Sequence, residues 1–328
     1  MFYAMKKKIR LLLFLCFILS AGAAFSQGPN NTGTYYRNAD GKTGAALKTA
    51  LGTIILPHAQ RTYKDLWTDF RSTDMRSDGK VWDMYSGVTN YVFGTDQAGN
   101  YKNEGDCYNR EHSFPKSWFN DEYPMYTDLF HLYPTDAKVN GMRSNYAFGE
   151  VGTVSWKSAG NFSKLGDAKS DLGYSGTVFE PNDEYKGDFA RAYFYMVTCY
   201  DDRCKGWNST MTNQTQYPCL SPWAVKMLMR WSANDPVSEK ETKRNEAVYK
   251  IQGNRNPYID YPGLEQYVWG DKMAQPFHYD GTSGIIDLAT GDAAQPQIVH
   301  DLSGRRMQNQ HRLRRGIYVK GRKKYVVR

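Results

Sequence analysis

Apolar residues recur with the spacing of a helix in five stretches of the chain. In such a pattern, side chains three and four positions apart share one face and can be buried together. The predicted helices cover residues 44–56, 62–70, 189–200, 222–231 and 238–251. Pro57 ends the first of them, and a capping box formed by Ser238 and Glu241 opens the last. The pattern therefore indicates a helix-rich protein.

Strand patterns are fewer and shorter than the helical ones. Residues 81–85 alternate apolar and polar side chains, and the C-terminal tail contains short alternating runs separated by glycine. Residues 281–295 are rich in Gly, Ala, Thr and Asp, which is typical of a linker. The prediction is an α+β fold, with a helix-rich domain over residues 27–280, a linker over 281–295 and a short β tail over 296–328.

Residues 1–26 have the layout of a secretory signal peptide. Basic residues come first, an apolar run from Leu11 to Leu19 follows, and Ala24-Phe25-Ser26 supplies small residues for cleavage. The run is too short for a comfortable membrane span, and no later stretch approaches the length of about 18 apolar residues that a span needs. We therefore expect an exported protein, secreted or at the cell surface, with no stable membrane span in the mature chain. The alternative is an N-terminal anchor or a lipoprotein.

The formal charge of +8 is not spread along the 328 residues. The composition, with 41% apolar and 15% aromatic residues, excludes a disordered chain, a collagen and a coiled coil. Residues 1–26 carry four basic residues and no acid, and residues 296–328 carry ten basic residues and one acid. The stretch between them keeps 28 of the 42 basic and 33 of the 34 acidic residues, a net charge of −5. A site for a polyanion must then be local, and we expect a metal ion to assist it.

Four cysteines remain after removal of the signal peptide: Cys107, Cys199, Cys204 and Cys219. An even number in an exported protein favours disulfide bonds. Cys199 and Cys204 would close a small loop and leave Cys107 with Cys219, although four cysteines allow three pairings. A zinc site is the alternative, but the C-x-x-C spacing and neighbouring histidines that it needs are missing.

A carboxylate stands directly beside an imidazole at Glu111-His112, just before Pro115. Histidine has the pKa of a general base near neutral pH, and an adjacent acid can bind a metal ion. Successive side chains on a strand point to opposite faces. The pair can therefore share a site only at a strand end, a bulge or a sheet edge.

A second group of polar residues follows on a predicted helix, for which Thr135 is the expected N-cap. Asp136, Asn140 and Arg143 are spaced so that they lie on one face of this helix. Carboxylate and amide oxygens are ligands for hard cations such as Mg²⁺ or Ca²⁺, and arginine matches the geometry of phosphate. The spacing thus predicts a divalent metal site beside a phosphate site.

Three long motifs in these regions resemble the endonuclease I family. They are YNREHSFPKSW (108–118), DLFHLYPTDAKVNGMRSNYAFGEV (128–151) and IQGNRNPYIDYP (251–262). They stand in the family's order, and the resemblance extends over roughly residues 45–275. It implies a secreted bacterial nonspecific nuclease with a ββα-metal core, also called a His-Me finger.

The resemblance also implies roles for individual residues. His112 is then the general base, and Glu111 and Asn140 bind one divalent ion, Mg²⁺ or in its place Mn²⁺ or Ca²⁺. The substrates implied are DNA, single- or double-stranded, and RNA, cleaved to 5′-phosphate and 3′-hydroxyl ends. Relatives steady the scissile phosphate with an arginine, and Arg110 and Arg143 are the candidates here.

Several of these residues also have purely structural interpretations. Asp136 is a candidate helper of the metal, but an acid in a first helical turn is also favoured by the helix dipole. Asn140 can instead end the helix, and Arg143 can hold the hairpin to the helix. For His131, we expect packing or the orientation of a neighbour rather than catalysis.

The tail carries a resemblance of its own. The runs DLSGRR (301–306), GIYV (316–319) and KKYVV (323–327) resemble the C-terminal sorting signal of the Bacteroidetes type IX secretion system. This implies that secretion machinery binds the tail and delivers the protein to the cell surface or the medium. The alternative is a basic tail that binds nucleic acid nonspecifically.

Two other classes of function are open to the sequence. An exported carbohydrate- or ligand-binding surface protein would use the 25 Tyr and 8 Trp residues, although aromatic richness does not account for the order of the three motifs. A metallopeptidase needs H-E-x-x-H or a comparable zinc pair, whereas this chain has Glu-His without a second histidine four positions away. A metal-dependent endonuclease remains the leading prediction.

Overall fold

The computed structural model describes residues 28–280 and, in the tail, residues 299–301, 316–320 and 323–327. The chain divides into two compact units, and the boundary in the sequence lies between residues 283 and 284. The predicted signal peptide over 1–26 and the predicted linker over 281–295 lie outside the described residues.

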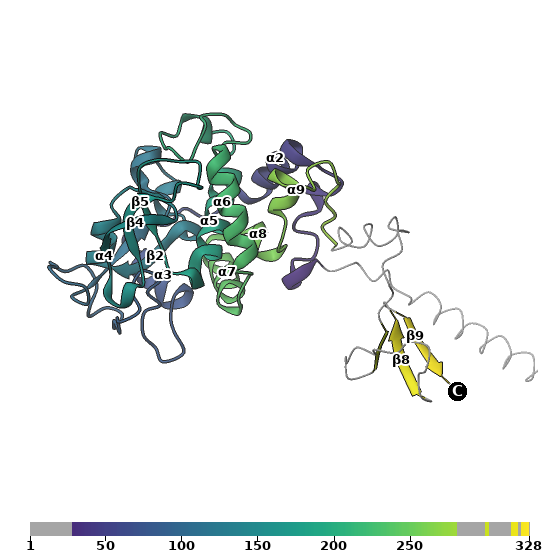
Figure 1. The fold of residues 1–328 in the computed structure, drawn as a ribbon, viewed down its shortest axis with the longest axis horizontal. Helices are drawn as coiled ribbons and strands as arrows, with labels where there is room; N and C mark the ends of the chain where they lie inside the picture. The colour runs from purple at the N-terminus through teal and green to yellow at the C-terminus, as the bar shows by residue number, and fades with distance from the viewer. Residues whose placement is uncertain (1–27, 281–298, 302–315, 321–322, 328) are drawn as a thin grey trace, which may run out of the picture. The chain divides into compact units, whose positions relative to one another are not determined.

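The body is built around helix α5 (Lys186–Cys199), in which every side chain from Gly187 onward is buried. A helix that is buried on all sides needs packing partners all round. Helices α2 (Gly44–Ile55), α6 (Pro222–Asn234) and α8 (Pro257–Asp260) pack against it, as Figure 1 shows. The helices predicted over 44–56, 189–200 and 222–231 are thereby confirmed.

Helix α7 (Glu239–Gln252) begins at the predicted capping box. The Ser238 hydroxyl accepts a hydrogen bond from the Glu241 N–H, and the Glu241 carboxylate accepts one from the Ser238 N–H. α7 packs against α3 (Leu66–Thr73), which begins four residues later than its pattern predicts. The delay has a local cause, because Thr62 and Asp65 exchange side-chain to backbone hydrogen bonds and form a turn.

Short helical turns complete the body. They are α9 (Glu265–Trp269) and the 3₁₀ helices η1 (Pro29–Asn31), η2 (Arg37–Ala39), η3 (Lys116–Phe119), η4 (Met125–Thr127), η5 (Leu129–His131), η6 (Ala159–Asn161), η7 (Asp183–Tyr185) and η8 (Cys204–Gly206). Three of them, η3, η4 and η5, lie between the two strands that carry the candidate site.

Two sheets form in the body. Strands β1 (Tyr108–His112) and β2 (Leu132–Asp136) make an antiparallel pair, and α4 (Ala137–Arg143) follows directly. A second sheet has the order β3-β6-β5-β4, with β3 and β6 parallel and the other neighbours antiparallel. Its strands are β3 (Ala147–Phe148), β4 (Val151–Lys157), β5 (Lys164–Ala168) and β6 (Thr177–Glu180).

The strand predicted over residues 81–85 is wrong. Only an isolated bridge from Val81 to Met75 forms there. The Asp83 carboxylate accepts hydrogen bonds from the N–H groups of Tyr85 and Ser86, which bends the backbone into a turn. The apolar residues of this segment, such as Val81, Met84 and Tyr85, are buried in the core, but the segment has no partner strand.

The tail contains a three-stranded antiparallel sheet of its own. Its strands, in the order β7-β8-β9, are β7 (Val299–Asp301), β8 (Gly316–Lys320) and β9 (Lys323–Val327). A helix-rich body with small sheets and a β tail confirms the predicted α+β fold class.

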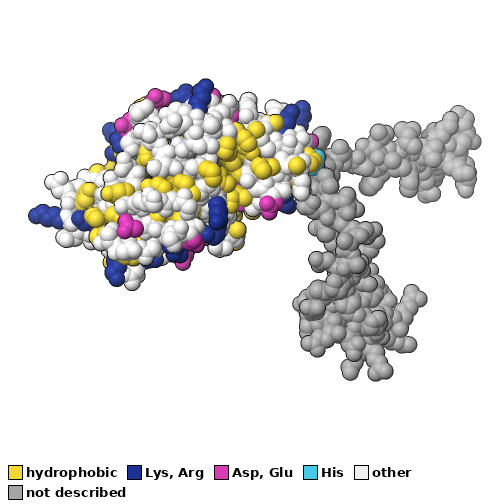
Figure 2. Space-filling view, turned by 45° about the horizontal axis from the view of Figure 1, so that its top comes forward, with side chains coloured by type: hydrophobic (Ala, Val, Ile, Leu, Met, Phe, Trp, Pro, Cys, Tyr) yellow, Lys and Arg dark blue, Asp and Glu magenta, His cyan; other side chains and the backbone are white. Residues whose placement is uncertain are grey.

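The surface of the body shows no single basic field on the face in view. In Figure 2, Lys and Arg side chains are scattered among Asp and Glu side chains. Across the described residues, no helix combines the length and the apolar character needed to cross a membrane.

Candidate active site

The β1–β2–α4 unit brings the two predicted groups of residues together. A pocket of about 340 Å³ is lined by Arg110, Glu111, His112, Asn140 and Arg143, among others. β1 ends at His112, so the pair Glu111-His112 stands at a strand end, one of the positions at which neighbours can share a site. The order strand, strand, helix is the arrangement expected of a ββα core.

Glu111 is buried, and one of its oxygens is held from two sides. Its Oε1 accepts hydrogen bonds from the Tyr85 hydroxyl and from Nη1 of Arg143, both at 2.7 Å. Among the described residues, Oε2 has no hydrogen-bond partner. Burial raises the pKa of the Glu111 carboxyl to about 7, although Arg143 and Tyr85 act in the opposite direction. Glu111 lines the pocket, and both hydrogen bonds of its carboxylate go to Oε1.

The His112 ring is fixed in one tautomer. Its Nε2 lies 3.0 Å from the carbonyl oxygen of Tyr126, an acceptor that cannot donate, so Nε2 carries the proton of the neutral ring. The Tyr126 ring stacks on the imidazole with 5.0 Å between centroids. Burial lowers the pKa of His112 well below its usual value, and the nearby His131 adds to this. Near neutral pH the ring is therefore neutral, with an unprotonated Nδ1.

Asn140 lies in the middle of α4, half-buried beside the pocket. The helix ends at Ser144, whose N–H bonds to the Asn140 carbonyl, so the alternative of Asn140 as a C-terminal cap is wrong. Within residues 28–280, its side-chain amide has no protein partner. Asn140 and Glu111 line the same pocket, and an amide oxygen with a carboxylate oxygen is a donor set that fits a hard divalent cation.

Arg143 is buried inside the protein and reaches back across the hairpin. Its guanidinium donates to Glu111 Oε1 and to the carbonyls of His112 and Ser113, with distances of 2.6–2.9 Å. It also lies against the Phe148 ring, at 4.7 Å. With 1% of its surface exposed, Arg143 holds the hairpin to the helix, which is the structural role considered for it from the sequence.

The family follows from comparison with known proteins. A model of the endonuclease I family matches residues 43–263. The extracellular ribonuclease of Bacillus subtilis (strain 168) is 36% identical over 246 residues, which cover 73% of this chain and 79% of that protein. The chain belongs to the endonuclease I family.

Other relatives cover shorter parts of the chain. Endonuclease-1 of Buchnera aphidicola (subsp. Baizongia pistaciae) is 30% identical over 133 residues, 40% of this chain and 46% of that protein. A periplasmic deoxyribonuclease of Aeromonas hydrophila is 29% identical over 140 residues, 42% of this chain and 48% of its own length. Because it belongs to the endonuclease I family, this chain is an endonuclease. The two alternative functions, a carbohydrate-binding protein and a peptidase, are no longer needed to explain its sequence.

Arg110 is placed differently from Arg143 in this endonuclease. Its guanidinium lies between two aromatic rings, 3.5 Å from the centroid of Tyr63 and 4.2 Å from that of Trp67. Nη1 donates to the Tyr63 carbonyl at 2.6 Å, and burial lowers the pKa of Arg110. Its Nε is buried and has no partner among the described residues, as is also true of Nε of Arg143. The two differ in exposure, because Arg110 is half-buried and Arg143 is 1% exposed. Of the two candidate arginines, Arg110 is therefore the one with more of its surface exposed.

Asp136 does not reach the pocket. It is the N-cap of α4, where its carboxylate accepts the N–H of Val139, and Thr135 is therefore not the cap. The same carboxylate accepts hydrogen bonds from the Tyr91 hydroxyl at 2.5 Å and from the Gly105 N–H at 2.7 Å. Since a cap precedes the helix, it does not continue the face that carries Asn140. The expectation of a metal helper at Asp136 is corrected to a capping role.

A second group of potential metal ligands lies elsewhere in the body. Ligand atoms of His58, Asp128 and Cys199 all lie within 4.8 Å of one another. The Asp128 carboxylate already accepts four hydrogen bonds, from Tyr195, Tyr200, Gln252 and the Phe130 N–H. A carboxylate with its lone pairs used in this way is part of a buried hydrogen-bond network.

His131 is also fully buried, with Nε2 2.7 Å from the Met125 carbonyl, and packs beside His112.

The sequence interpretation missed the residues that orient the site. Tyr85 holds Glu111, and the Tyr126 carbonyl fixes His112, yet both lie on segments without a polar motif of their own. Lys116, which also lines the pocket, could have been predicted from the sequence, because it belongs to the first family motif. Its ammonium lies 5.4 Å from the Tyr126 ring and pairs with Asp121.

Proposed function

We propose that this endonuclease is an exported, metal-dependent enzyme that hydrolyses phosphodiester bonds of DNA and RNA to 5′-phosphate and 3′-hydroxyl ends. One observation carries the proposal: His112 has its Nε2 proton bound to the Tyr126 carbonyl, while Nδ1 is left in the same pocket as Glu111 and Asn140. Relatives named as ribonuclease and deoxyribonuclease support both substrates.

His112 acts as the general base. The hydrogen bond to Tyr126 keeps Nε2 protonated, so the lone pair at Nδ1 accepts the proton of the attacking water. The imidazolium that forms is stabilised at Nε2 by the same carbonyl. Stacking on Tyr126 holds the ring plane during the transfer.

Glu111 and Asn140 would hold one divalent ion, Mg²⁺, with Mn²⁺ or Ca²⁺ as substitutes, because both line the pocket and offer carboxylate and amide oxygens, the ligands that such ions prefer. When bound, the ion supplies positive charge for a nonbridging phosphate oxygen and for the leaving 3′ oxygen. Arg143 and Tyr85 keep Glu111 in place. Arg110, on the rim, is the group that steadies the scissile phosphate.

The route out of the cell completes the proposal. Residues 1–26 direct export and are removed, and secretion machinery reads the tail from residue 296. Relatives named as extracellular and periplasmic support an exported protein. The endonuclease then acts at the cell surface or in the medium.

Plasmid nicking tests the proposed reaction. With Mg²⁺ the wild-type chain should convert supercoiled DNA to nicked circles, and EDTA should stop it. His112→Ala should lower the rate by about 10²–10⁴-fold, the contribution of a general base, and leave the circular dichroism spectrum unchanged. His278→Ala, at the edge of the body, is the matched control and should retain activity. Near-wild-type nicking by His112→Ala would assign the base to another residue, with His131 the next candidate.

A further inference from the structure

A second cavity in the body has no part in the proposed reaction. It has a volume of about 350 Å³, and three aromatic residues, Trp82, Phe162 and Tyr185, form its walls together with polar residues of the segment 76–89. This volume lies at the lower end of the range for ligand cavities, about 300–1,000 Å³. It offers room for one flat ring system.

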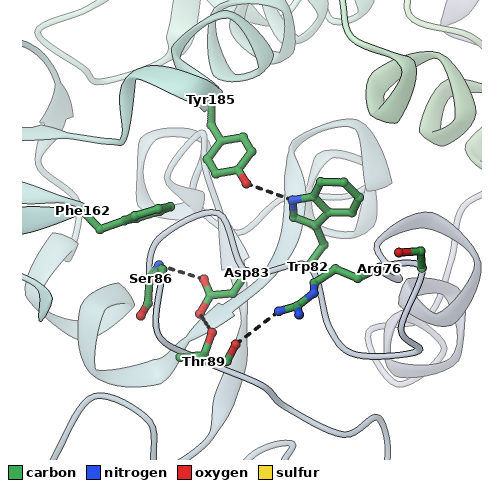
Figure 3. Close-up of a pocket in the computed structure, with 9 residues that line it drawn as sticks. Arg76, Trp82, Asp83, Ser86, Thr89, Phe162 and Tyr185 are labelled. Atoms are coloured by element: carbon green, nitrogen blue, oxygen red, sulfur yellow. Dashed lines mark hydrogen bonds between the residues drawn. The ribbon is translucent and has the colours of Figure 1, made fainter. Parts of the chain in front are cut away.

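The aromatic walls are fixed in position. In Figure 3 the rings of Phe162 and Trp82 stand on opposite sides of the opening, with Tyr185 at one end. The indole Nε1 of Trp82 donates to the Tyr185 hydroxyl at 3.0 Å. Phe162 lies directly against Gly87, because a Cβ on Gly87 would come within 2.7 Å of its ring. Trp82 and Phe162 are only half-buried, so ring surface remains open to a ligand.

The charged groups around this cavity already have partners. The Lys240 ammonium lies over the Trp82 and Tyr185 rings, at 5.5 and 4.9 Å, and is ion-paired with Asp188. The Asp83 carboxylate is already used, since it accepts hydrogen bonds from the N–H groups of Tyr85, Ser86 and Asp136 and from the Thr89 hydroxyl. Arg76 on the rim is ion-paired with Asp78 at 2.5 Å. A ligand would therefore be held by its flat faces, which favours a planar ring without a large charge.

The segment that forms the cavity also supports the active site. Asp83 lines the cavity and accepts the N–H of Asp136, the cap of α4. Two residues later, Tyr85 donates to Glu111. Two residues of backbone span at most about 7 Å. Asp83 at the cavity is therefore connected to Glu111, the predicted metal ligand, through two residues of backbone and the hydrogen bond between the side chains of Tyr85 and Glu111.

Residues 101–104 link the cavity and the active-site pocket. The Tyr101 hydroxyl lies against Gly141, next to Asn140, since a Cβ on Gly141 would come within 2.6 Å of it. The Glu104 carboxylate accepts a hydrogen bond from Ser86, which lines the cavity. Protein contacts thus run without a break from Asn140 to the cavity.

We propose that the cavity binds one unpaired nucleobase of the strand that is cleaved, stacked on the ring of Phe162 at the opening. This inference rests on the proposed nuclease function and adds a substrate class to it, single-stranded nucleic acid. A base in a duplex must first leave the helix before it can enter such a cavity, whereas a base in a single strand enters directly. Stacking on aromatic rings accepts every base, so the cavity selects for strandedness and not for sequence.

Matched substitutions at Phe162 test the cavity. Phe162→Leu keeps apolar bulk against Gly87 but removes the flat ring, and Phe162→Tyr restores it. The Leu variant should lower kcat/KM on a single-stranded oligonucleotide about tenfold, mainly through KM, and change cleavage of the duplex of the same sequence by less than about threefold. The Tyr variant should behave like wild type. Trp223→Leu, which removes a half-buried indole outside both cavities, should change neither substrate.

Photo-crosslinking of the wild-type chain gives a measurement that does not depend on a variant. A single-stranded oligonucleotide with one 5-iodouracil, bound in EDTA to prevent turnover, should crosslink to peptides that contain Trp82, Phe162 or Tyr185. Unlabelled single strands should compete for this crosslink, whereas a neutral oligosaccharide should not.

Equal losses on single-stranded and duplex DNA would overturn the inference. Crosslinks confined to residues 110–117, or competition by the oligosaccharide alone, would do the same. If the wild-type chain cleaves neither substrate, the nuclease function fails instead, and the crosslink in EDTA still reports on the cavity.

Discussion

Two arginines border the same pocket, but the structure uses them in different ways. Arg143 is buried with hydrogen bonds to Glu111 and two backbone carbonyls, whereas Arg110 is half-buried between two rings on the rim. Removing one partner of a buried ion pair costs about 3–5 kcal/mol, because the other charge is left unpaired. A rim arginine that meets a phosphate contributes instead to the salt dependence of binding.

Opposite effects are therefore expected from Arg143→Gln and Arg110→Gln. The first should lower the free energy of unfolding in urea by about 3–5 kcal/mol and leave the salt slope of DNA binding in EDTA unchanged. The second should leave the stability nearly unchanged and reduce the slope of log K against log salt by about 1. A reduced salt slope for Arg143→Gln, without loss of stability, would show that Arg143 touches the substrate.

Metal binding should depend on pH through Glu111. The pKa of this carboxyl is raised to about 7 by burial, so below pH 7 the metal-free site holds a proton that an ion must displace. The apparent affinity for Mg²⁺ should fall about tenfold for each pH unit below 7 and stay level above it. Titration of Mg²⁺ by calorimetry between pH 5.5 and 8.5, with proton release measured in two buffers, checks this.

Two variants separate Glu111 from the other ligand in the same titration. Asn140→Ala should weaken Mg²⁺ binding at every pH and keep the slope, because its amide does not titrate. Glu111→Gln should weaken binding and remove the slope. A wild-type affinity that does not change with pH would mean that Glu111 is ionised before the metal arrives.

At the residue scale, the sequence predicts which side chains share the pocket but not what holds them. Glu111, His112 and Asn140 stand in family motifs, and all three line one pocket. Tyr85 lies 26 positions before Glu111, and its hydroxyl bond depends on the tertiary fold. Asp136 was misassigned because helical spacing assumes that the helix has already begun, whereas this residue caps it.

At the element scale, predictions succeeded where the signal is local. α7 begins at its capping box, and α2 ends one residue before the expected limit. The strand predicted over 81–85 failed because an Asp side chain competes for the backbone N–H groups. Most of β4 is exposed, so its sequence lacks the alternating pattern of a half-buried strand.

The cysteines give a prediction at the same scale. All four described cysteines are buried thiols, and those of Cys204 and Cys219 lie close enough for each to shift the pKa of the other. Cys199 bonds to the Ile55 carbonyl and Cys107 to Gly99. The pairing of Cys199 with Cys204, considered from their spacing, is therefore not the favoured one.

In an oxidising compartment we expect a Cys204–Cys219 disulfide. It would close a loop of about 15 residues and stabilise the fold by about 3 kcal/mol, which corresponds to a rise in Tm of roughly 6–12 °C. Alkylation without reductant followed by mass spectrometry identifies the bond, and thermal unfolding with and without dithiothreitol measures its effect. Cys107→Ser should retain the response to dithiothreitol, and Cys219→Ser should lose it. Alkylation of all four thiols in protein recovered from the medium would contradict the pairing.

At the scale of the whole molecule, the main cluster of positive charge and the proposed active site lie in different parts of the sequence. The body carries a net charge of −5 between residues 27 and 295, and the tail holds ten basic residues against one acid. Because phosphate contacts dominate affinity for nucleic acid, the tail is the obvious binding element by charge alone. The proposed catalytic residues all line a pocket in the body, and a local pocket that binds a metal ion would not need a basic surface.

We predict that deletion of residues 296–328 leaves cleavage nearly unchanged and blocks delivery to the cell surface or the medium. The tail belongs to a separate compact unit, and β7, β8 and β9 pair only with one another among the described strands. A tail that folds as a small sheet is suited to recognition as a unit, whereas a solvated basic arm would lack such pairing. Plasmid nicking by a purified chain that ends at residue 295, beside the chain that keeps the tail, measures the catalytic effect, and fractionation of cells and medium measures export. A loss of activity beyond about tenfold, or roughly 1.4 kcal/mol, would show that the tail binds the substrate, and unchanged export would show that it is not the sorting signal.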